Sequence, residues 1–451
     1  MKPINRRRFL QLINTGAASL SLLPVINLFA EQAPVAGKLP DLGPLTPRIP
    51  TNTDDLRNAV IGDLRGRALL SLPAGFTYSA ISATGDLLSD GQSRVPSHHD
   101  GMAAFSGDGD NIILVRNHEL DRDGLGNTRC ARDDHPAYDP SQAGGTTTLT
   151  LDSAGQLMRH EISLAGTARN CAGGLTPWGS WLSCEETFSE GRSGLRHGYV
   201  FEVPCQGLAT HQPLTAMGRF NHEAAAVDPN TGVVYLTEDR GDGLLYRFTP
   251  SRKGDLQAGG VLDALQFADF SSGIDTARTL GSQIFRPFPV RWVRIDEPDP
   301  DRESGRRSTR AQGRAKGAAR FSRGEGAWWG NDRLYFSSTS GGRAGRGQIF
   351  SFDPNTQTLT LVIEATNEHT LAAPDNLTVG PQGHVYICED GSGVERIWGL
   401  TGEGRLFEVA RNVLNGSETA GICFSPVQDL MFVNIQDPGL TCVIRGPWAS
   451  V

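Results

Sequence analysis

The stretch NCAGGLTPWGSWLSCEET, residues 170–187, contains the pattern from which the fold of the whole chain can be inferred. It begins with an amide, Asn170, passes through glycine and proline turns, and continues in an apolar segment that ends in Cys184, Glu185 and Glu186. Short apolar segments bounded by glycine and proline indicate β-strands joined by turns. A strand that ends in a thiol and two carboxylates indicates a metal site, because these groups are metal ligands.

The same layout returns along the chain. Each copy has a polar loop, a turn, a short apolar strand that ends in polar residues, and a further strand. We count six copies, whose first motifs occupy residues 98–105, 170–177, 221–229, 323–330, 373–381 and 417–426. The copies begin roughly 45–55 residues apart, except at insertions near 121–143 and 251–320, and this period is typical of propeller blades. The sequence therefore predicts an all-β fold, a six-bladed β-propeller with a metal site at the mouth of its central channel.

The predicted propeller is a single domain over residues 75–451. Residues 34–74, rich in Pro, Thr and Leu, are interpreted as a linker or an arm that wraps the domain. The segment 297–320 is highly charged and poor in large apolar residues. We expect an exposed loop there, and a lid over the channel is the alternative.

Composition limits the classes of function. The chain has 451 residues, 54 glycines and a formal net charge of −8. The acidic balance argues against a nucleic-acid-binding surface and favours cations as ligands. The seven cysteines lack C-x-x-C spacing, which argues against a tight disulfide scaffold and a zinc ribbon. Their pairing, including Cys130 with Cys205, stays open.

Residues 1–33 have the features of an export signal, with Arg6 and Arg7 followed by Phe9 and an apolar run. Adjacent arginines are typical of the twin-arginine type, whose machinery exports folded proteins. No later segment has the roughly 18 apolar residues that a membrane helix needs. We therefore expect a periplasmic or secreted protein whose mature form has no stable membrane span.

Recurring polar residues indicate where the chemistry lies. In a propeller, the first strand of each blade lines the channel, so equivalent positions of the copies converge at one mouth. One set accompanies the first strands, at Asp100, Asn170, Glu223, Glu325, Asp375 and Glu418. A second set closes the following strands, at Asn117, His118 and Glu119, at Cys184, Glu185 and Glu186, at Glu238 and Asp239, at Glu389 and Asp390, and at Asp437. Converging carboxylates need cations to offset their repulsion. Oxygen ligands suit calcium, whereas the thiolate of Cys184 suits a transition metal such as iron or zinc.

Arg323 precedes Glu325 by two residues in the stretch FSRGEGAWWG. An arginine in this place either holds a metal-binding carboxylate or binds a phosphate through two hydrogen bonds. Cys171, Cys388 and Cys423 lie among Ala, Gly, Ile and Phe and are interpreted as core residues. No G-x-S-x-G, P-loop or H-E-x-x-H motif occurs, so serine-hydrolase, P-loop and zincin functions have no support from motifs.

A series of ordered motifs resembles a known family. The motifs are NHE at 117–119, TPWGSWLSCEE at 176–186, GRFNHEAAAVDP at 218–229, YLTED at 235–239, RGEGAWW at 323–329, and PDNLTV with CEDG within 374–391. They resemble the PhoX-type bacterial alkaline phosphatases over nearly all of the expected mature chain. The insertions between the copies are shorter than in the larger members of that family.

The resemblance implies a six-bladed propeller, a twin-arginine signal and hydrolysis of phosphate monoesters. It also implies a mixed cluster of about two Fe3+ and about two or three Ca2+ ions. In this chain, Cys184 would bind iron, Glu223 and Glu325 would bridge metals, and Arg323 would bind phosphate. The calcium ligands would come from Asp375, Glu185, Glu238, Glu389 and Asp390.

The mechanism that we expect is metal-assisted phosphoryl transfer without a protein nucleophile. Arg323 would stabilise the charge on the phosphoryl oxygens, with Asn170 as a second donor. Two alternatives remain at this point: a calcium-dependent propeller lactonase or esterase, and a non-catalytic calcium-binding propeller. Cys184 and Arg323 favour the phosphatase, because neither alternative needs them.

Overall fold

The structure is a computed structural model that describes residues 40, 42–131, 136–281, 283–367 and 371–451. The chain divides into two units, Met1–Leu39 and Pro40–Val451, and the described residues belong to the second. The predicted export signal at 1–33 lies outside the described residues. Among the described residues, no helix has the length and apolar character to cross a membrane.

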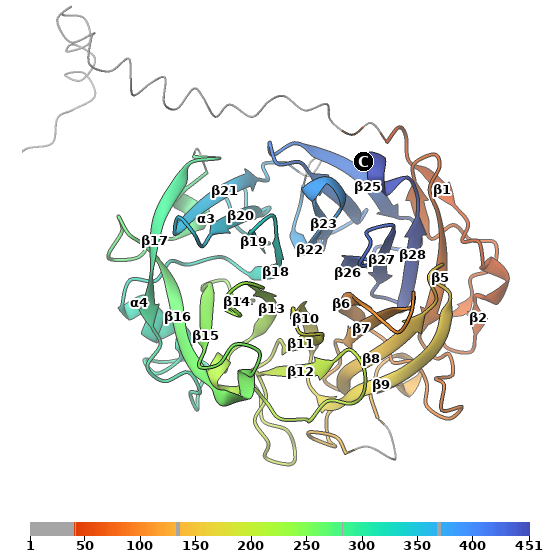
Figure 1. Cartoon of the computed structure of the whole chain (residues 1–451), viewed down its shortest axis with the longest axis horizontal. Coiled ribbons are helices and arrows are strands. Elements are labelled where there is room, and N and C mark those ends of the chain that lie inside the picture. Colours follow the sequence, from red (N-terminus) through yellow and green to blue (C-terminus); the bar gives the residue numbers. More distant parts are fainter. Residues whose placement is uncertain (1–39, 41, 132–135, 282, 368–370) are drawn as a thin grey trace, which may run out of the picture. The chain divides into compact units, whose positions relative to one another are not determined.

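The second unit is mostly β and has a propeller-like arrangement (Figure 1). Four antiparallel groups begin with what we call the first and second strands: β6 (His99–Ser106) and β7 (Ile112–His118), β10 (Asn170–Leu175) and β11 (Ser180–Glu185), β22 (Pro374–Val379) and β23 (Val385–Glu389), and β26 (Thr419–Phe424) and β27 (Leu430–Ile435). Two more such pairs are β13 (His222–Val227) with β14 (Val234–Glu238), and β18 (Gly324–Gly330) with β19 (Arg333–Ser338).

Further strands complete the sheets. They are β8 (Gly144–Leu151), β9 (Leu157–Thr167), β12 (Val200–Pro204), β15 (Tyr246–Pro250), β16 (Gly260–Phe267), β17 (Pro287–Arg294), β20 (Gln348–Asp353), β21 (Thr358–Glu364), β24 (Arg396–Leu400), β25 (Leu406–Asn412) and β28 (Leu440–Arg445). The strand β17 pairs with both β16 and β21, and so joins two groups into one nine-stranded sheet.

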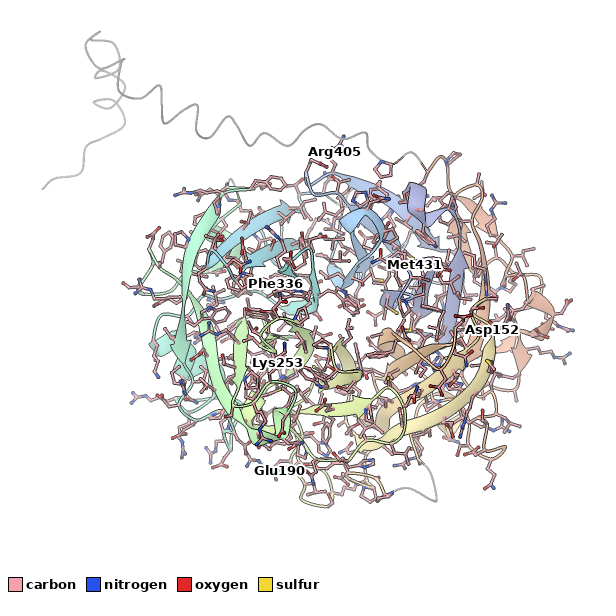
Figure 2. All side chains as sticks on the ribbon, viewed as in Figure 1. Asp152, Glu190, Lys253, Phe336, Arg405 and Met431 are labelled. Atoms are coloured by element: carbon pink, nitrogen blue, oxygen red, sulfur yellow. The ribbon has the colours of Figure 1, made fainter. Side chains whose placement is uncertain are left out.

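The first strands form a closed ring. Contacts join β6 to β10, β10 to β13, β13 to β18, β18 to β22, β22 to β26, and β26 back to β6. Apolar side chains fill the space between neighbouring sheets, as for the buried Phe336 and Met431, whereas Glu190 is exposed (Figure 2). Burial of these side chains is the main stabilising contribution to such a fold.

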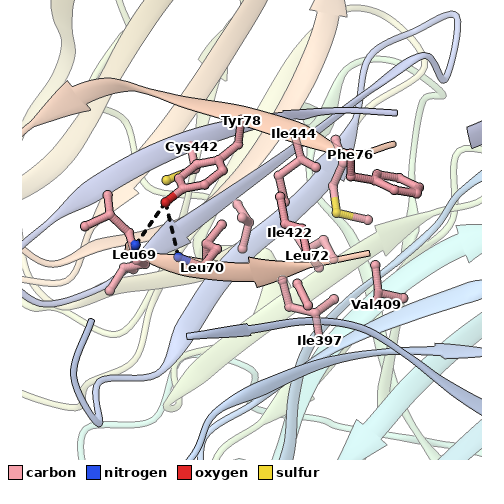
Figure 3. Packing of buried hydrophobic residues seen from close by; sticks show 14 of the residues in the cluster. Leu69, Leu70, Leu72, Phe76, Tyr78, Ile397, Val409, Ile422, Cys442 and Ile444 are labelled. Atoms are coloured by element: carbon pink, nitrogen blue, oxygen red, sulfur yellow. Dashed lines mark hydrogen bonds between the residues drawn. The ribbon is translucent and has the colours of Figure 1, made fainter. Parts of the chain in front are cut away.

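The start of the unit closes the ring with its end. The strand β5 (Thr77–Ala83) pairs antiparallel with β28, in register from Leu440 with Ala83 to Arg445 with Thr77. The strands β1 (Thr46–Arg48) and β4 (Leu70–Leu72) add to the sheet of β22–β25. The buried hydroxyl of Tyr78 accepts hydrogen bonds from the N–H groups of Leu69 and Leu70, which ties β4 to β5 (Figure 3).

The charged segment 297–320 differs from the expected exposed loop. Its second half contains the helix α4 (Thr309–Ala315), which begins with a side-chain cap from Ser308 to the N–H of Ala311. Arg310 in this helix lies 2.6 Å from the buried carboxylate of Glu238. The charges of the segment are therefore partly used in packing against the rest of the unit, which the absence of large apolar residues did not reveal.

Candidate metal centre

A bulge near the start of each first strand organises the centre. In β10, Asn170 pairs with Glu185 and Gly173 pairs with Ser183, so β10 has one residue more than β11 between these pairs. The same shift occurs in β6, β13, β18, β22 and β26. A β-bulge of this kind re-aims a side chain at the rim of a sheet. In five of the strands, the first bulged residue is acidic or a thiol: Asp100, Cys171, Glu223, Glu325 and Asp375.

Close packing of the bulges brings these side chains together. Gly101 follows Asp100, and a Cβ atom on Gly101 would lie only 2.6 Å from the Cα of Ala172 in the neighbouring strand. A Cβ on Gly326 would lie 2.5 Å from the carbonyl oxygen of Asp375. These two glycines are therefore required by the approach of the neighbouring backbone.

A second set of side chains comes from the residues that follow the second strands. The N–H groups of Glu119, Glu186, Asp239 and Asp390 donate, over 2.9 to 3.2 Å, to the carbonyl oxygens of His98, Arg169, Asn221 and Ala373, which precede the first strands. After β27 the residue is Gln436, whose backbone N–H donates to the carbonyl oxygen of Glu418 at 3.2 Å. Its side-chain amide donates to the carboxylates of Asp100 and Glu119. The two sets thus meet at one end of the ring of first strands.

Three of the predicted ligands instead make hydrogen bonds or ion pairs with residues outside the three ligand groups described below. Glu185 accepts hydrogen bonds from three backbone N–H groups and one imidazole. Glu238 pairs with Arg310, and Glu389 accepts from the indole N–H of Trp398 at 2.9 Å. Successive side chains of a strand point to opposite faces. The neighbouring residues Glu186, Asp239 and Asp390 face the centre instead. Asp390 was among the predicted ligands, whereas Glu186 and Asp239 were not.

Cys184 is also displaced from its predicted role. Its side chain is fully buried in an apolar cluster with Leu182, Val200 and Leu236. Among the described residues, Cys184 belongs to none of the groups of side chains that could hold a metal ion. The thiol that lies among the carboxylates is Cys171, which the sequence analysis assigned to the core.

Three overlapping groups of side chains could each hold a metal ion. They are Asp100 with Glu119 and Cys171, Cys171 with Glu186 and Glu223, and Glu223 with Glu325 and Asp375. Within each group, the potential ligand atoms lie within 4.8 Å of one another. Cys171 and Glu223 each belong to two groups, so the three groups form a continuous chain.

Glu223 has the strongest signature of a ligand. Both of its carboxylate oxygens are buried, and neither has a hydrogen-bond partner among the described residues. A buried carboxylate without a partner carries a large desolvation penalty. Burial and then the charges of Glu325 and Glu186 raise its pKa well above the usual range. A cation bound between these carboxylates would remove that penalty.

The other acids of the centre share this electrostatic stress. Burial raises the pKa of Glu186 to about 8, and burial together with the charge of Asp390 raises the pKa of Asp375 to about 8. Burial, Glu119 and Asp375 raise the pKa of Asp100 well above its ordinary value. Side chains this close cannot all ionise without cations, so the donor set fits a cluster of metal ions.

The two residues predicted to bind substrate lie in different settings. Asn170 is buried, donates to the hydroxyl of Ser183 at 2.8 Å and accepts from the hydroxyl of Thr167 at 2.6 Å. Its amide is therefore engaged within the protein. Arg323 is 40% exposed in its side chain and contacts Asp239 at 2.8 Å and Glu325 at 2.7 Å.

Among the members of the three groups, Asp100 and Glu186 were recognised as recurring polar residues but not assigned as ligands, and Cys171 was assigned to the core. The sequence contained a signal for Cys171. If NCAGG at 170–174 is aligned with NHEAA at 221–225 so that Asn170 lies opposite His222, then Cys171 lies opposite Glu223. The strand register at the bulges determines this alignment, whereas the sequence alone favours aligning Asn170 with Asn221.

A family model identifies the group of proteins to which the chain belongs. The family model described as alkaline phosphatase PhoX matches residues 58–160 and 153–439, which is most of the chain. The chain belongs to the PhoX alkaline phosphatase family. It is accordingly a phosphomonoesterase, and the lactonase and the non-catalytic alternatives are replaced by this assignment.

One solved PhoX structure has a similar fold. PhoX of Pseudomonas fluorescens, in complex with vanadate, a transition state analogue, matches 84% of this chain and 96% of its own, at 17% identity and a TM-score of 0.64. A gluconolactonase from Xanthomonas campestris, XC5397, matches 90% of this chain and 98% of its own, at 13% identity and a TM-score of 0.43. No curated protein matches the chain.

Proposed function

We propose that this PhoX-family phosphatase hydrolyses phosphate monoesters at a cluster of iron and calcium ions in the centre of a six-bladed propeller. The closed ring of first strands supports six blades, one for each of these strands. The observation that carries the cluster is Glu223, whose two buried oxygens have no partner among the described residues and which belongs to two of the three potential ligand groups.

The donor set supports the mixed composition. Carboxylate oxygens suit calcium, and a single thiolate among them suits iron. We assign the thiolate to Cys171 in place of Cys184, and the carboxylates to Asp100, Glu119, Glu186, Glu223, Glu325 and Asp375. When bound, the ions would supply Lewis-acid stabilisation of the phosphoryl oxygens and activation of water.

In the proposed reaction, the bond between phosphorus and the alcohol oxygen breaks, the oxygen of water bonds to phosphorus, and the alcohol leaves with a proton. Arg323 binds the phosphoryl group. Its Nε and Nη2 are held by Asp239 and Glu325, and its Nη1 has no hydrogen-bond partner among the described residues. Burial opposes the charge, but Asp239 and Glu325 raise the pKa of Arg323, so the guanidinium stays positive. Asn170 orients β10 through Ser183 in this proposal.

We further propose that the protein is exported in folded form by the twin-arginine pathway and acts in the periplasm or outside the cell. The support is the arginine pair and apolar run in residues 1–33. Export after folding would let the ligands acquire their metals before translocation.

Elemental analysis of the exported protein, combined with an assay on a generic phosphomonoester, tests the proposal. Iron and calcium in the purified protein, with turnover that chelation abolishes and that re-addition of metals restores, are the expected results. Turnover at the full rate after all metal has been removed would refute the cluster. Calcium without iron would refute the assignment of Cys171 as an iron ligand.

A further inference from the structure

Arg169 and Arg323 occupy equivalent positions in two different sheets. Each directly precedes a first strand, β10 or β18, and each lies two residues before a bulged ligand candidate, Cys171 or Glu325. Both have left-handed backbone, with φ of 49° and 53°, which is uncommon for an arginine. The carbonyl oxygens of both arginines accept a hydrogen bond from the residue after the second strand, at 2.9 and 2.8 Å.

The backbone and side-chain contacts of the two arginines are also equivalent. The backbone N–H of Arg169 donates to the carbonyl oxygen of Leu120, directly after Glu119, at 2.9 Å. The backbone N–H of Arg323 donates to the carbonyl oxygen of Arg240, directly after Asp239, also at 2.9 Å. Each guanidinium then contacts the carboxylate that follows the second strand of the preceding pair, β7 for Arg169 and β14 for Arg323. Arg169 lies 2.6 Å from Glu119, and Arg323 lies 2.8 Å from Asp239.

Each arginine also contacts a carboxylate of the strand pair that it precedes, β10 with β11 or β18 with β19. Arg169 lies 2.5 Å from Glu186, and Arg323 lies 2.7 Å from Glu325. Glu186 and Glu325 belong to the two ligand groups that share Glu223. Each arginine therefore contacts a member of a different one of the two groups that share Glu223.

In both guanidiniums, one nitrogen has no hydrogen-bond partner among the described residues. The side chains of Arg169 and Arg323 are each 40% exposed. In Arg169, Nε donates to the carbonyl oxygen of Glu186 and Nη2 contacts the carboxylates. Its Nη1 has no hydrogen-bond partner among the described residues, and the same holds for Nη1 of Arg323. A guanidinium fixed by two nitrogens and open at the third is arranged to bind an oxyanion.

We propose that Arg169 is a second phosphate-binding residue, which holds an oxygen of the phosphoryl group from the β10 side while Arg323 holds another from the β18 side. This inference rests on the proposed function and deepens it. Two guanidiniums favour a group with several free anionic oxygens, so the preferred ligand class is the dianionic phosphate of a monoester. The competing explanation is that Arg169 only neutralises Glu119 and Glu186.

Equilibrium binding of inorganic phosphate to the metal-loaded protein separates these explanations, with the metal content measured on the same samples. The variants are R169M, which removes the guanidinium, and R169K, which keeps the charge beside Glu119 and Glu186 but loses the planar fork. R323M is the positive control. R196M is the matched control, because Arg196 is similarly exposed, at 31%, and pairs with Asp299 away from the ligand groups.

We expect R169K to keep the metal content of the parent and to bind phosphate about tenfold more weakly, and R169M to bind it about 10- to 100-fold more weakly per loaded site. R196M should bind phosphate like the parent. Parent-like phosphate affinity in metal-loaded R169K and R169M would overturn the inference and leave the proposed function intact. A metal-loaded parent that binds no phosphate would overturn both.

Discussion

Replacement of the two cysteines of the stretch 170–187 distinguishes the site thiol from the core thiol. The pair C171A and C184A removes the same atom from two places that are separated by thirteen residues in the sequence. Cys171 belongs to two of the three potential ligand groups, whereas Cys184 lies in an apolar cluster. The two variants should therefore fail in different ways.

The size of each effect follows from these environments. Without Cys171, the first group retains Asp100 and Glu119, and the second retains Glu186 and Glu223. Loss of a partner that merely supports a ligand weakens metal binding about 10- to 100-fold, so loss of the ligand itself should cost at least about 100-fold. C184A should instead create a small cavity and cost about 1–2 kcal/mol of folding free energy.

Three measurements on each variant complete the test: iron per chain by elemental analysis, turnover of a generic phosphomonoester, and the midpoint of urea unfolding. We expect C171A to lose iron and turnover together. C184A should keep both, with a lower unfolding midpoint. If C184A lost iron while C171A retained it at the full rate, the assignment of the thiol by the register of β10 would be refuted.

Three further predictions concern the carboxylates. E186Q should lower the metal content, whereas E185Q should lower the stability by about 1–3 kcal/mol and leave the metal content unchanged, because Glu185 is hydrogen-bonded within its sheet; equal metal loss in both variants would contradict this. Folding raises the pKa of Glu186 and Asp375 to about 8, so the folded, metal-free protein holds protons that the unfolded chain releases above about pH 4. The stability that these groups contribute should be fully present below about pH 4 and be lost as the pH rises through about 8. Urea midpoints of chelated protein that rise from pH 6 to pH 9 would contradict the sign. R310M should leave Glu238 buried and unpaired and cost about 3–5 kcal/mol, and the double variant R310M/E238Q should recover much of that loss in urea unfolding.

The general architecture could be predicted because it depends on local patterns. Short apolar runs separated by glycine turns recur at a nearly constant period, and β10 with β11, for instance, lies within the second predicted copy. The carboxylates of the centre were also largely recognised, since Glu223, Glu325 and Asp375 stand at matching places in the copies. Repetition made these positions visible without any structure.

The exact ligands could not be read in the same way, because they depend on which face a side chain takes. One residue of slip reverses the face in a strand. The pair Glu185 and Glu186 shows this, since both are acidic and only the second faces the centre. The bulge in β10 adds another slip, so that Cys171 and not the recurring polar residue Asn170 lies among the potential metal ligands. A bulge has no signature in the sequence except for small residues that many turns also contain.

The site also depends on contacts between the two ends of the unit, which no local pattern describes. Asp100 lies in β6, at the seam next to the sheet that β5 and β28 complete. Across this seam, Asn434 donates to the carbonyl oxygen of Asp100 at 2.6 Å, and Gln436 donates to its carboxylate at 3.0 Å. More than 330 residues separate these partners along the chain. Bringing them together costs chain entropy that only the packing of the closed ring can offset. Two members of the first potential ligand group, Asp100 and Glu119, therefore receive hydrogen bonds from the far end of the chain, so in our proposal closure of the ring positions this group and couples metal binding to folding.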